Sequence, residues 1–175
     1  MTPIQIVSLV LSILAAVYLA VMIFVISTIG HFVSRMRKVM IGISIVLSER
    51  KEIFLSIVDD FQNMGVSFRG SDIAVFDQVR AMQADHLKAR DVSEISALFR
   101  EAESRLRFLF GKNPWANKSA KQRELWSTLE ELDANYRQTI VNYNTELTGY
   151  NYWVKVPFCH WIPWLFGFRV REKLN

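Results

Sequence analysis

The sequence predicts an all-α fold: an N-terminal transmembrane helix, an antiparallel four-helix bundle and an aromatic C-terminal tail. Two observations lead to this prediction. No charged side chain precedes Arg35, and all 21 Lys and Arg and all 17 Asp and Glu of the 175 residues stand at or after it. Beyond Arg35, apolar residues recur at steps of three and four, the period of a helix face, and no alternating strand pattern competes. We therefore divide the chain into an anchor over 1–34, a bundle over 35–152 and a tail over 153–175.

The composition argues against several classes of partner. A net charge of +4 and a pI near 9.3 suit an anionic membrane surface. The longest basic run, over 35–38, is too short to indicate a nucleic-acid partner. The single cysteine, Cys159, cannot form an intrachain disulfide. His31, His86 and His160 stand far apart and at no metal-ligand spacing, so we expect neither a metal nor a cofactor.

The anchor is predicted by the apolar run over 4–29. At about 1.5 Å per residue, this run is longer as a helix than the ~30 Å hydrocarbon core of a bilayer. A cleaved signal peptide is the alternative, but it would have a basic n-region and a shorter apolar core. We therefore expect an anchor that is not cleaved.

The charges after the run predict its orientation. Arg35, Arg37 and Lys38 follow it directly, and positive charge is retained on the cytoplasmic side of a membrane. We expect a single-pass protein with its N-terminus outside and its bundle in the cytoplasm. The inverted topology is the alternative.

Four apolar stripes predict helices over 36–64, 72–88, 92–111 and 115–152. The last stripe is the most regular, and its apolar positions are Leu125, Leu129, Leu132, Tyr136, Ile140, Tyr143, Leu147 and Tyr150. Gly65 can close the first helix in a left-handed conformation.

Local signals predict where the later helices begin. Ser71 or Asp72 can cap the second helix, and Asp91 with Glu94 forms a capping box for the third. Asn113-Pro114 offers a cap and a first-turn proline to the fourth. The break between the second and third helices, at 88–92, matters most. With four helices the chain returns to the membrane, and the tail lies near the bilayer. If the second and third helices merge, three long helices place the tail at the end of the bundle away from the membrane.

The tail combines aromatic with basic residues: Trp153, Trp161, Trp164, Phe166, Phe168, Arg169 and Arg171. Aromatic rings favour the membrane–water interface, and basic groups favour anionic headgroups. We expect an interfacial foot made of these residues together with Arg35, Arg37 and Lys38. A tail folded back over the bundle and a contact between protomers are the two alternatives.

Three motifs of the chain resemble the LemA family of bacterial membrane proteins. Tyr143-Asn144 and Tyr150-Asn151 repeat one heptad apart, as Tyr-Asn does near the end of the last helix in that family. Pro157 is followed by a Leu-Phe-Gly-Phe ending over 165–168, and 113–117 resembles the family's proline-led entry to its last helix. The resemblance covers essentially the whole chain.

The resemblance implies an anchored four-helix bundle at the bacterial inner membrane, without an established enzymatic activity or cofactor. The chain departs from the family pattern after the first span. Leu55 and Ser56 replace a proline-asparagine pair, and Ile140 replaces an arginine that tends to precede the first Tyr-Asn. Any bend or amide contact that the missing pair provides is therefore not expected here.

Few residues suggest chemistry. Cys159 and His160 are neighbours, but a thiolate and its base normally come from distant positions with a third orienting group, and none can be named. We therefore expect no catalytic residue. The acidic patch formed by Glu124, Glu130, Glu131 and Asp133 is interpreted as a solvated helix face, because a Glu-x-x-His spacing is absent.

Five residues are candidates for helix packing and register: Arg50, Tyr143, Asn144, Tyr150 and Asn151. Arg50 falls within an apolar stripe, so its head either reaches water along the core edge or pairs with a carboxylate from the second or last helix. The two Tyr-Asn pairs either fix the register between helices or subunits, or make ordinary hydrogen bonds.

Three classes of function compete. A scaffold that self-assembles or holds an unidentified protein partner requires no chemical motif, and we favour it. A channel or membrane-remodelling assembly requires a ring of subunits, because a span without ionisable residues forms no polar pathway alone. An enzyme is the least favoured, because no nucleophile–base pair, phosphate loop or metal cluster is apparent. The expected partners are the lipid bilayer and further copies of the chain.

Overall fold

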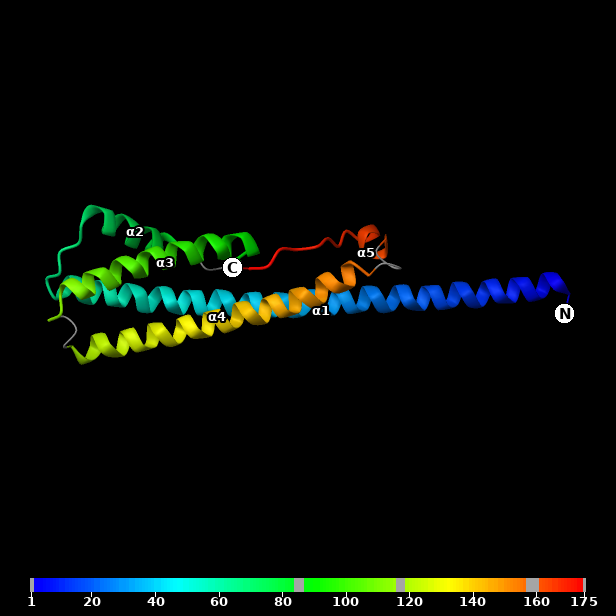
Figure 1. The fold of residues 1–175 in the computed structure, drawn as a ribbon, viewed down its shortest axis with the longest axis horizontal. Coiled ribbons are helices and arrows are strands. Elements are labelled where there is room, and N and C mark those ends of the chain that lie inside the picture. Colours follow the sequence, from blue (N-terminus) through cyan, green and yellow to red (C-terminus); the bar gives the residue numbers. More distant parts are fainter. Residues whose placement is uncertain (1, 84–86, 116–118, 157–160, 175) are drawn as a thin grey trace. The chain divides into compact units, whose positions relative to one another are not determined.

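The computed structural model describes residues 2–83, 87–115, 119–156 and 161–174. Every regular element in these ranges is a helix, which confirms the all-α class. The helices are traced in Figure 1: α1 (Pro3–Asn63), α2 (Gly70–Ala81), α3 (Ala89–Lys112), α4 (Ala120–Val154) and α5 (Trp161–Leu165). They form two compact units. The first unit is Met1–Lys38 with Asn144–Lys173, and the second is Val39–Tyr143 with Leu174–Asn175.

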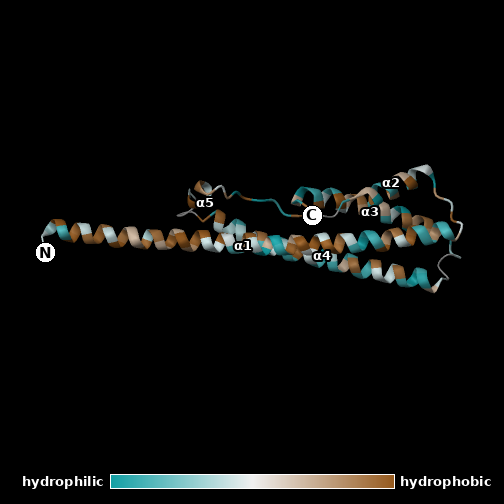
Figure 2. Cartoon of the chain, turned by 180° about the vertical axis from the view of Figure 1, so that it is seen from behind, coloured by the Kyte–Doolittle hydropathy of each residue, from teal (hydrophilic) through white to brown (hydrophobic). Residues whose placement is uncertain are grey.

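Helix α1 contains both the predicted anchor and the predicted first helix of the bundle. Its most apolar 18-residue window has a mean hydropathy of 3.0 and is only 6% buried. Figure 2 colours most of the N-terminal half as hydrophobic. Gly30 and Gly42 lie inside the helix, because glycine weakens a helix interior by only about 1 kcal/mol. Within the described ranges, α1 is therefore the one helix that is long and apolar enough to cross a membrane.

The end of α1 follows the prediction. Gly65 has a φ of 83°, the left-handed conformation that glycine adopts without strain. Its N–H donates to the Gln62 carbonyl, and the Val66 N–H donates to the Phe61 carbonyl. These two bonds form a Schellman motif, which satisfies the last carbonyls of the helix.

Helix α2 is shorter than predicted. It begins at Gly70, so Asp72 is its third residue rather than its cap, and Asp72 Oδ2 accepts the Arg69 N–H at 3.2 Å. It ends at Ala81 instead of 88, because Met82 is extended and its carbonyl accepts a 2.6 Å hydrogen bond from Lys51 Nζ. A cation at a helix C-terminus stabilises that end.

Helix α3 is a separate helix, as the predicted break requires, but its start differs from the prediction. It begins at Ala89, and Asp91 is the third residue rather than the cap. Asp91 Oδ2 accepts the Lys88 N–H at 2.9 Å. The apolar steps of three and four in this helix predict a buried Leu98, but Leu98 is only half-buried, whereas Val92 and Phe99 are fully buried.

Helix α4 begins at Ala120 instead of 115. The reason is that Asn113 ends α3: its backbone N–H and its side-chain Nδ2 both donate to the Leu109 carbonyl. The residue is therefore used as a C-cap of the preceding helix. Ala116 and Asn117, which belong to the motif over 113–117, lie outside the described residues.

The core of the second unit is formed by the predicted stripes. Its fully buried residues include Ile43, Leu47, Phe54, Ile57 and Phe61 from α1, Val79 from α2, Phe99, Ala102 and Leu106 from α3. Helix α4 adds Leu129, Tyr136, Ile140 and Tyr143. Aromatic rings interlock at the centre, where Phe54 packs edge-on against both Phe76 and Phe99. The helical period predicts most of this core, but it does not predict Phe99, and Leu125 and Leu132 of the last stripe are only half-buried.

Candidate functional site

The last turns of α4 pack closely against α1 in the first unit. Gly149 makes this possible, because a Cβ added to it would lie 2.5 Å from Phe32 Cε1. One turn earlier, Glu146 Oε1 pairs with Arg35 Nη1 at 3.3 Å. The two helices run antiparallel here, since later residues of α4 meet earlier residues of α1.

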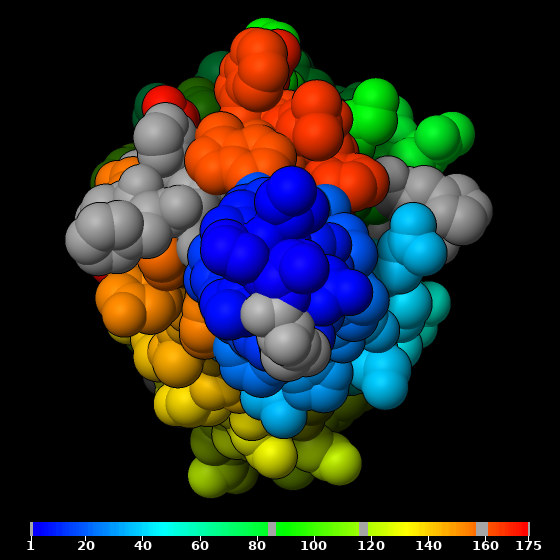
Figure 3. All heavy atoms as spheres, turned by 90° about the vertical axis from the view of Figure 1, so that its right-hand side faces the viewer, coloured from blue at the N-terminus to red at the C-terminus, as the bar shows by residue number. Residues whose placement is uncertain are grey.

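Aromatic contacts continue this antiparallel alignment toward the N-terminus of α1. Trp153 packs edge-on against Phe24 with ring centroids 5.7 Å apart, and Trp161 stacks flat on Tyr18 at the same distance. Figure 3 is viewed from the N-terminal end of α1 and shows the orange-red residues of α5 against the blue residues of α1. The start of α5 thus lies beside the most apolar part of the chain.

Helix α5 has one buried and one exposed side. Ile162 and Pro163 are buried, and the exposed fractions of Trp164, Leu165 and Phe166 are 74%, 62% and 51%. Large exposed apolar side chains that cluster on one surface indicate a binding surface. This cluster of three residues is called the α5 face below.

The chain turns back after α5 and is held by the end of α4. Gly167, with a φ of 75°, makes the turn. The Tyr150 hydroxyl donates to the Arg169 carbonyl at 2.9 Å. The Asn151 amide both donates to the Arg171 carbonyl at 2.8 Å and accepts the Arg171 N–H at 3.0 Å. These three hydrogen bonds are called the tail clamp, and they close the segment that carries α5 into a loop.

The tail clamp was missed by sequence reasoning. The Tyr-Asn repeat is visible in the sequence, but no residue pattern reveals that Tyr150 and Asn151 bind the backbone of the tail. Tyr150 is fully buried and also lies under the Arg171 guanidinium, which is 5.1 Å from the ring centroid. Tyr143 is buried one heptad earlier, and Asn144 is half-buried.

The remaining residues predicted to contact a membrane surface are distributed as follows. Arg37, Lys38 and Arg169 are exposed, and Phe168 is half-buried. The Phe168 N–H donates to the Pro163 carbonyl at 2.9 Å. The structure therefore brings Trp153, Trp161, Trp164, Phe166, Phe168, Arg169, Arg171 and Arg35 into the first unit, together with Arg37 and Lys38.

Arg50 lies in the core of the second unit with only 4% of its surface exposed. Its Nη2 pairs with Glu103 Oε1 of α3 at 2.6 Å and with Asp133 Oδ1 of α4 at 2.8 Å. Its guanidinium also lies over the rings of Phe99 and Tyr136, a cation–π arrangement. The head does not reach water along the core edge, and Asp133 is not part of a solvated acidic patch.

Tyr136 completes this polar cluster. Burial raises the pKa of its phenol, and the contact with the Ser96 hydroxyl opposes that effect. The phenol is consequently neutral near pH 7. A buried cation with two carboxylates and two rings holds α1, α3 and α4 together.

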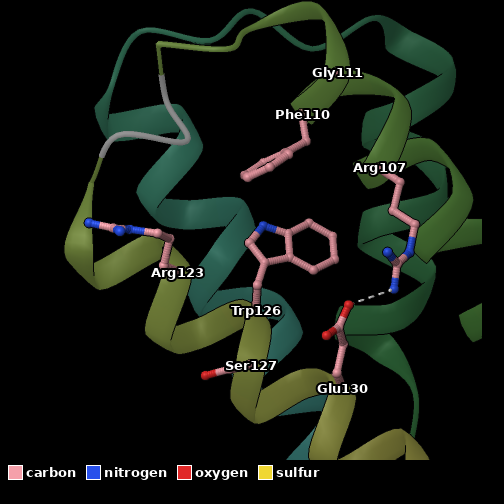
Figure 4. Close-up of a pocket in the computed structure, with 7 residues that line it drawn as sticks. All are labelled: Arg107, Phe110, Gly111, Arg123, Trp126, Ser127 and Glu130. Carbon is pink, nitrogen blue, oxygen red and sulfur yellow. Dashed lines mark hydrogen bonds and ion pairs between the residues drawn. The ribbon is translucent and has the colours of Figure 1, made fainter.

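A cavity of about 400 Å³ lies between α3 and α4 in the second unit. Figure 4 shows the rings of Phe110 and Trp126 between Arg123 and Arg107. Arg107 pairs with Glu130 at 3.5 Å and lies over the Trp126 ring. The Trp126 Nε1 has no hydrogen-bond partner among the described residues. Sequence reasoning gave no sign of this cavity, because its residues lie on two helices.

The described residues contain no group of three or more His, Cys, Asp or Glu side chains that could hold a metal ion. Cys159 and His160 lie outside the described residues, as do Pro157 and His86. Comparisons of the chain with protein-family models, with curated proteins and with solved structures returned no match.

Proposed function

We propose that this chain is a non-enzymatic, membrane-anchored helical scaffold of the LemA type. In this proposal α1 crosses the bilayer with its N-terminus outside. An antiparallel four-helix bundle in the cytoplasm self-assembles or holds a protein partner at the bacterial inner membrane. The aromatic and basic residues of the tail contact the bilayer.

The single observation that carries the proposal is the exposure of the apolar part of α1. Its most apolar window is only 6% buried. The core helix of a soluble protein would be mostly buried, because exposing so much apolar surface to water is unfavourable. A helix of this kind is stable in a hydrocarbon environment.

A signal sequence would also be apolar and near the N-terminus, but two features favour an anchor. The same helix continues without interruption to Asn63. Its exposed apolar segment is also partly covered by Trp153 and Trp161 from the C-terminal part of the chain. Cleavage would remove Tyr18 and Phe24, the partners of these rings.

Membrane anchoring is tested by alkaline carbonate extraction followed by intact-mass measurement of the membrane fraction. The proposal predicts a protein that stays with the membrane and has the mass of the chain with its first residues intact. Protein released by carbonate, or a mass that shows loss of residues up to about the end of the apolar run, would refute the anchor.

Scaffolding by self-assembly is tested separately by measuring the mass of the detergent-solubilised particle. A particle of several chains supports assembly. A monomer at all protein concentrations, combined with no protein partner in cross-linked membranes, would contradict the scaffold while leaving the anchor in place.

A further inference from the structure

We infer that the α5 face is embedded among the acyl chains of one leaflet, so that the chain contacts the bilayer at a second place beside its transmembrane helix. The inference rests on the proposed anchoring of α1. It goes beyond an interfacial contact, because it places α5 inside the hydrocarbon and names acyl chains as its partner.

The depth follows from the partners of the tail on α1. Residues 4–24 of α1 span about 30 Å at 1.5 Å per residue, which is the thickness of the hydrocarbon core. If the hydrocarbon core of the bilayer starts as far toward the N-terminus as Ile4, its other boundary falls near Phe24, the partner of Trp153. Any shift of the core toward Arg35 moves this boundary beyond Phe24.

Trp161 lies deeper than this boundary in either case. Its partner Tyr18 precedes Phe24 by six residues, which corresponds to about 9 Å along the helix. Trp164 and Leu165 of the α5 face belong to the same short helix as Trp161, and Phe166 follows its last residue. The exposed rings of this face and the Leu165 side chain are therefore at a depth where the surrounding medium is hydrocarbon.

The backbone of this segment is suited to hydrocarbon, where unpaired polar groups are costly. Pro163 has no N–H to satisfy. The N–H groups of Phe166, Gly167 and Phe168 donate to the carbonyls of Ile162, Trp164 and Pro163. The turn thus satisfies several of its own groups, as an inserted loop must.

The charged residues agree with a loop that enters and leaves the same leaflet. Arg169 and Arg171 follow the turn, and the tail clamp holds this stretch against the end of α4, close to the Arg35–Glu146 pair. The Arg171 guanidinium lies over the Tyr150 ring, on the side of the first unit that carries the Arg35–Glu146 pair, where headgroups and water are expected.

The test uses the full chain in vesicles of phosphatidylcholine and phosphatidylglycerol. One variant keeps only Trp164, with the other tryptophans replaced by phenylalanine, and a matched control keeps only Trp115, which is exposed in the second unit. The quenchers are iodide in the water and lipids brominated near either the glycerol end or the methyl end of the acyl chain. Helical circular dichroism checks that both variants fold.

The inference predicts a blue-shifted Trp164 emission that bromine near the methyl end of the acyl chain quenches at least as strongly as bromine near the glycerol end, because Trp164 follows Trp161, which lies about 9 Å or more inside the hydrocarbon boundary. Iodide quenching of Trp164 should be several-fold weaker than that of Trp115. If iodide quenches Trp164 as strongly as Trp115 while the protein resists carbonate extraction, the inference is overturned and the anchor stays intact. Shielding from both iodide and brominated lipid would also overturn it, because another protein surface would then cover the face. Protein that fails to stay in the vesicles would refute the anchoring itself.

A second measurement covers the case in which the tryptophan replacements disturb folding. A nitroxide is attached at Leu165→Cys, and for control at Arg90→Cys, in a Cys159→Ser background. Oxygen should relax the label at 165 more than a water-soluble nickel complex does, and the reverse should hold at 90. Equal nickel access at both positions would contradict the inference.

Discussion

Gly149 is the glycine of the first unit with the least room for a side chain. A methyl group there would overlap the Phe32 ring, whereas a methyl group on Gly30 meets nothing within 4 Å. Both glycines lie inside helices, where alanine is intrinsically preferred. Their different surroundings separate the effect of packing from that of helix propensity.

We predict that Gly149→Ala destabilises the first unit by about 1–2 kcal/mol, because overpacking outweighs the gain in propensity. Gly30→Ala should stabilise it by about 0.5–1 kcal/mol. The loss of helical circular dichroism in a denaturant titration of the detergent-solubilised chain measures both. Equal stabilisation by the two variants would show that Phe32 does not contact Gly149.

The ion pairs of Arg50 lead to a second prediction about a single residue, which concerns the stability of the second unit. Arg50→Met should cost about 2–4 kcal/mol, because it leaves the Glu103 and Asp133 carboxylates without their shared cation in a partly buried site. Arg90→Met is the matched control, since the Arg90 side chain is 88% exposed and pairs with Glu94 of its own helix. Surface pairs of this kind contribute little. The same denaturant titration should show a large loss of unfolding free energy for Arg50→Met and almost none for Arg90→Met. Similar losses for the two variants would contradict the account.

Asp60 predicts a dependence of stability on pH. The hydrogen bond from Lys121 lowers the pKa of Asp60, with a further contribution from the Gln122 amide. A lowered pKa in the folded state contributes stability that is complete above the unfolded pKa of about 3.9 and is lost as the pH falls through the folded value.

The corresponding experiment compares the denaturation midpoint of Asp60→Asn with that of the unaltered chain across the acid range. The variant should be less stable near neutral pH, and the difference should vanish below the folded pKa. Asp77→Asn, which removes an exposed carboxylate 3.5 Å from Arg80, should leave the midpoint nearly unchanged. A constant difference for Asp60→Asn at all pH values would exclude the charge as its cause.

At the scale of the element, the tail depends on the end of α4 more than on its own sequence. Residues 169–171 have no regular structure, and the three bonds of the tail clamp hold their backbone. The side chain of Asn151 satisfies one donor and one acceptor of Arg171, as a neighbouring strand would. The position of residues 169–171, which follow α5, therefore depends on two side chains of α4.

We predict that Asn151→Ala releases the tail and speeds trypsin cleavage after Arg169 and Arg171 several-fold. Tyr150→Phe removes one of the three bonds and should have a smaller effect. Asn142→Ala is the control, because Asn142 is exposed on the same helix and accepts a hydrogen bond from Gln138. Mass spectrometry of the cleavage products over time measures the rates. Equal rates for all three variants would show that the clamp does not hold the tail.

At the scale of the whole molecule, the sequence predicts the features that depend on neighbours along one helix. The apolar run of α1 and the buried stripes of α3 and α4 are local patterns of this kind. The left-handed residue Gly65 is another. The four-helix arrangement, its membrane topology and its relation to the LemA family stay predictions.

The features that sequence reasoning missed depend on residues that are distant in the chain. Lys51 caps α2 from 31 residues away, and Asn151 binds a backbone 20 residues later. The pattern placed Arg50 within an apolar stripe but could not select Glu103 and Asp133 from the carboxylates of other helices. Such pairings arise only when several helices have packed.

The central claim is that the N-terminal half of α1 lies in lipid and that the helix leaves the bilayer before Arg35. Nitroxide labels at exposed positions of α1, introduced by Leu14→Cys, Ile23→Cys and Ile41→Cys in a Cys159→Ser background, test it in lipid nanodiscs. We predict that oxygen relaxes the label at 14 far more than a water-soluble nickel complex does, that the label at 23 is intermediate, and that nickel dominates at 41. Nickel access at 14 equal to that at 41 would contradict the account.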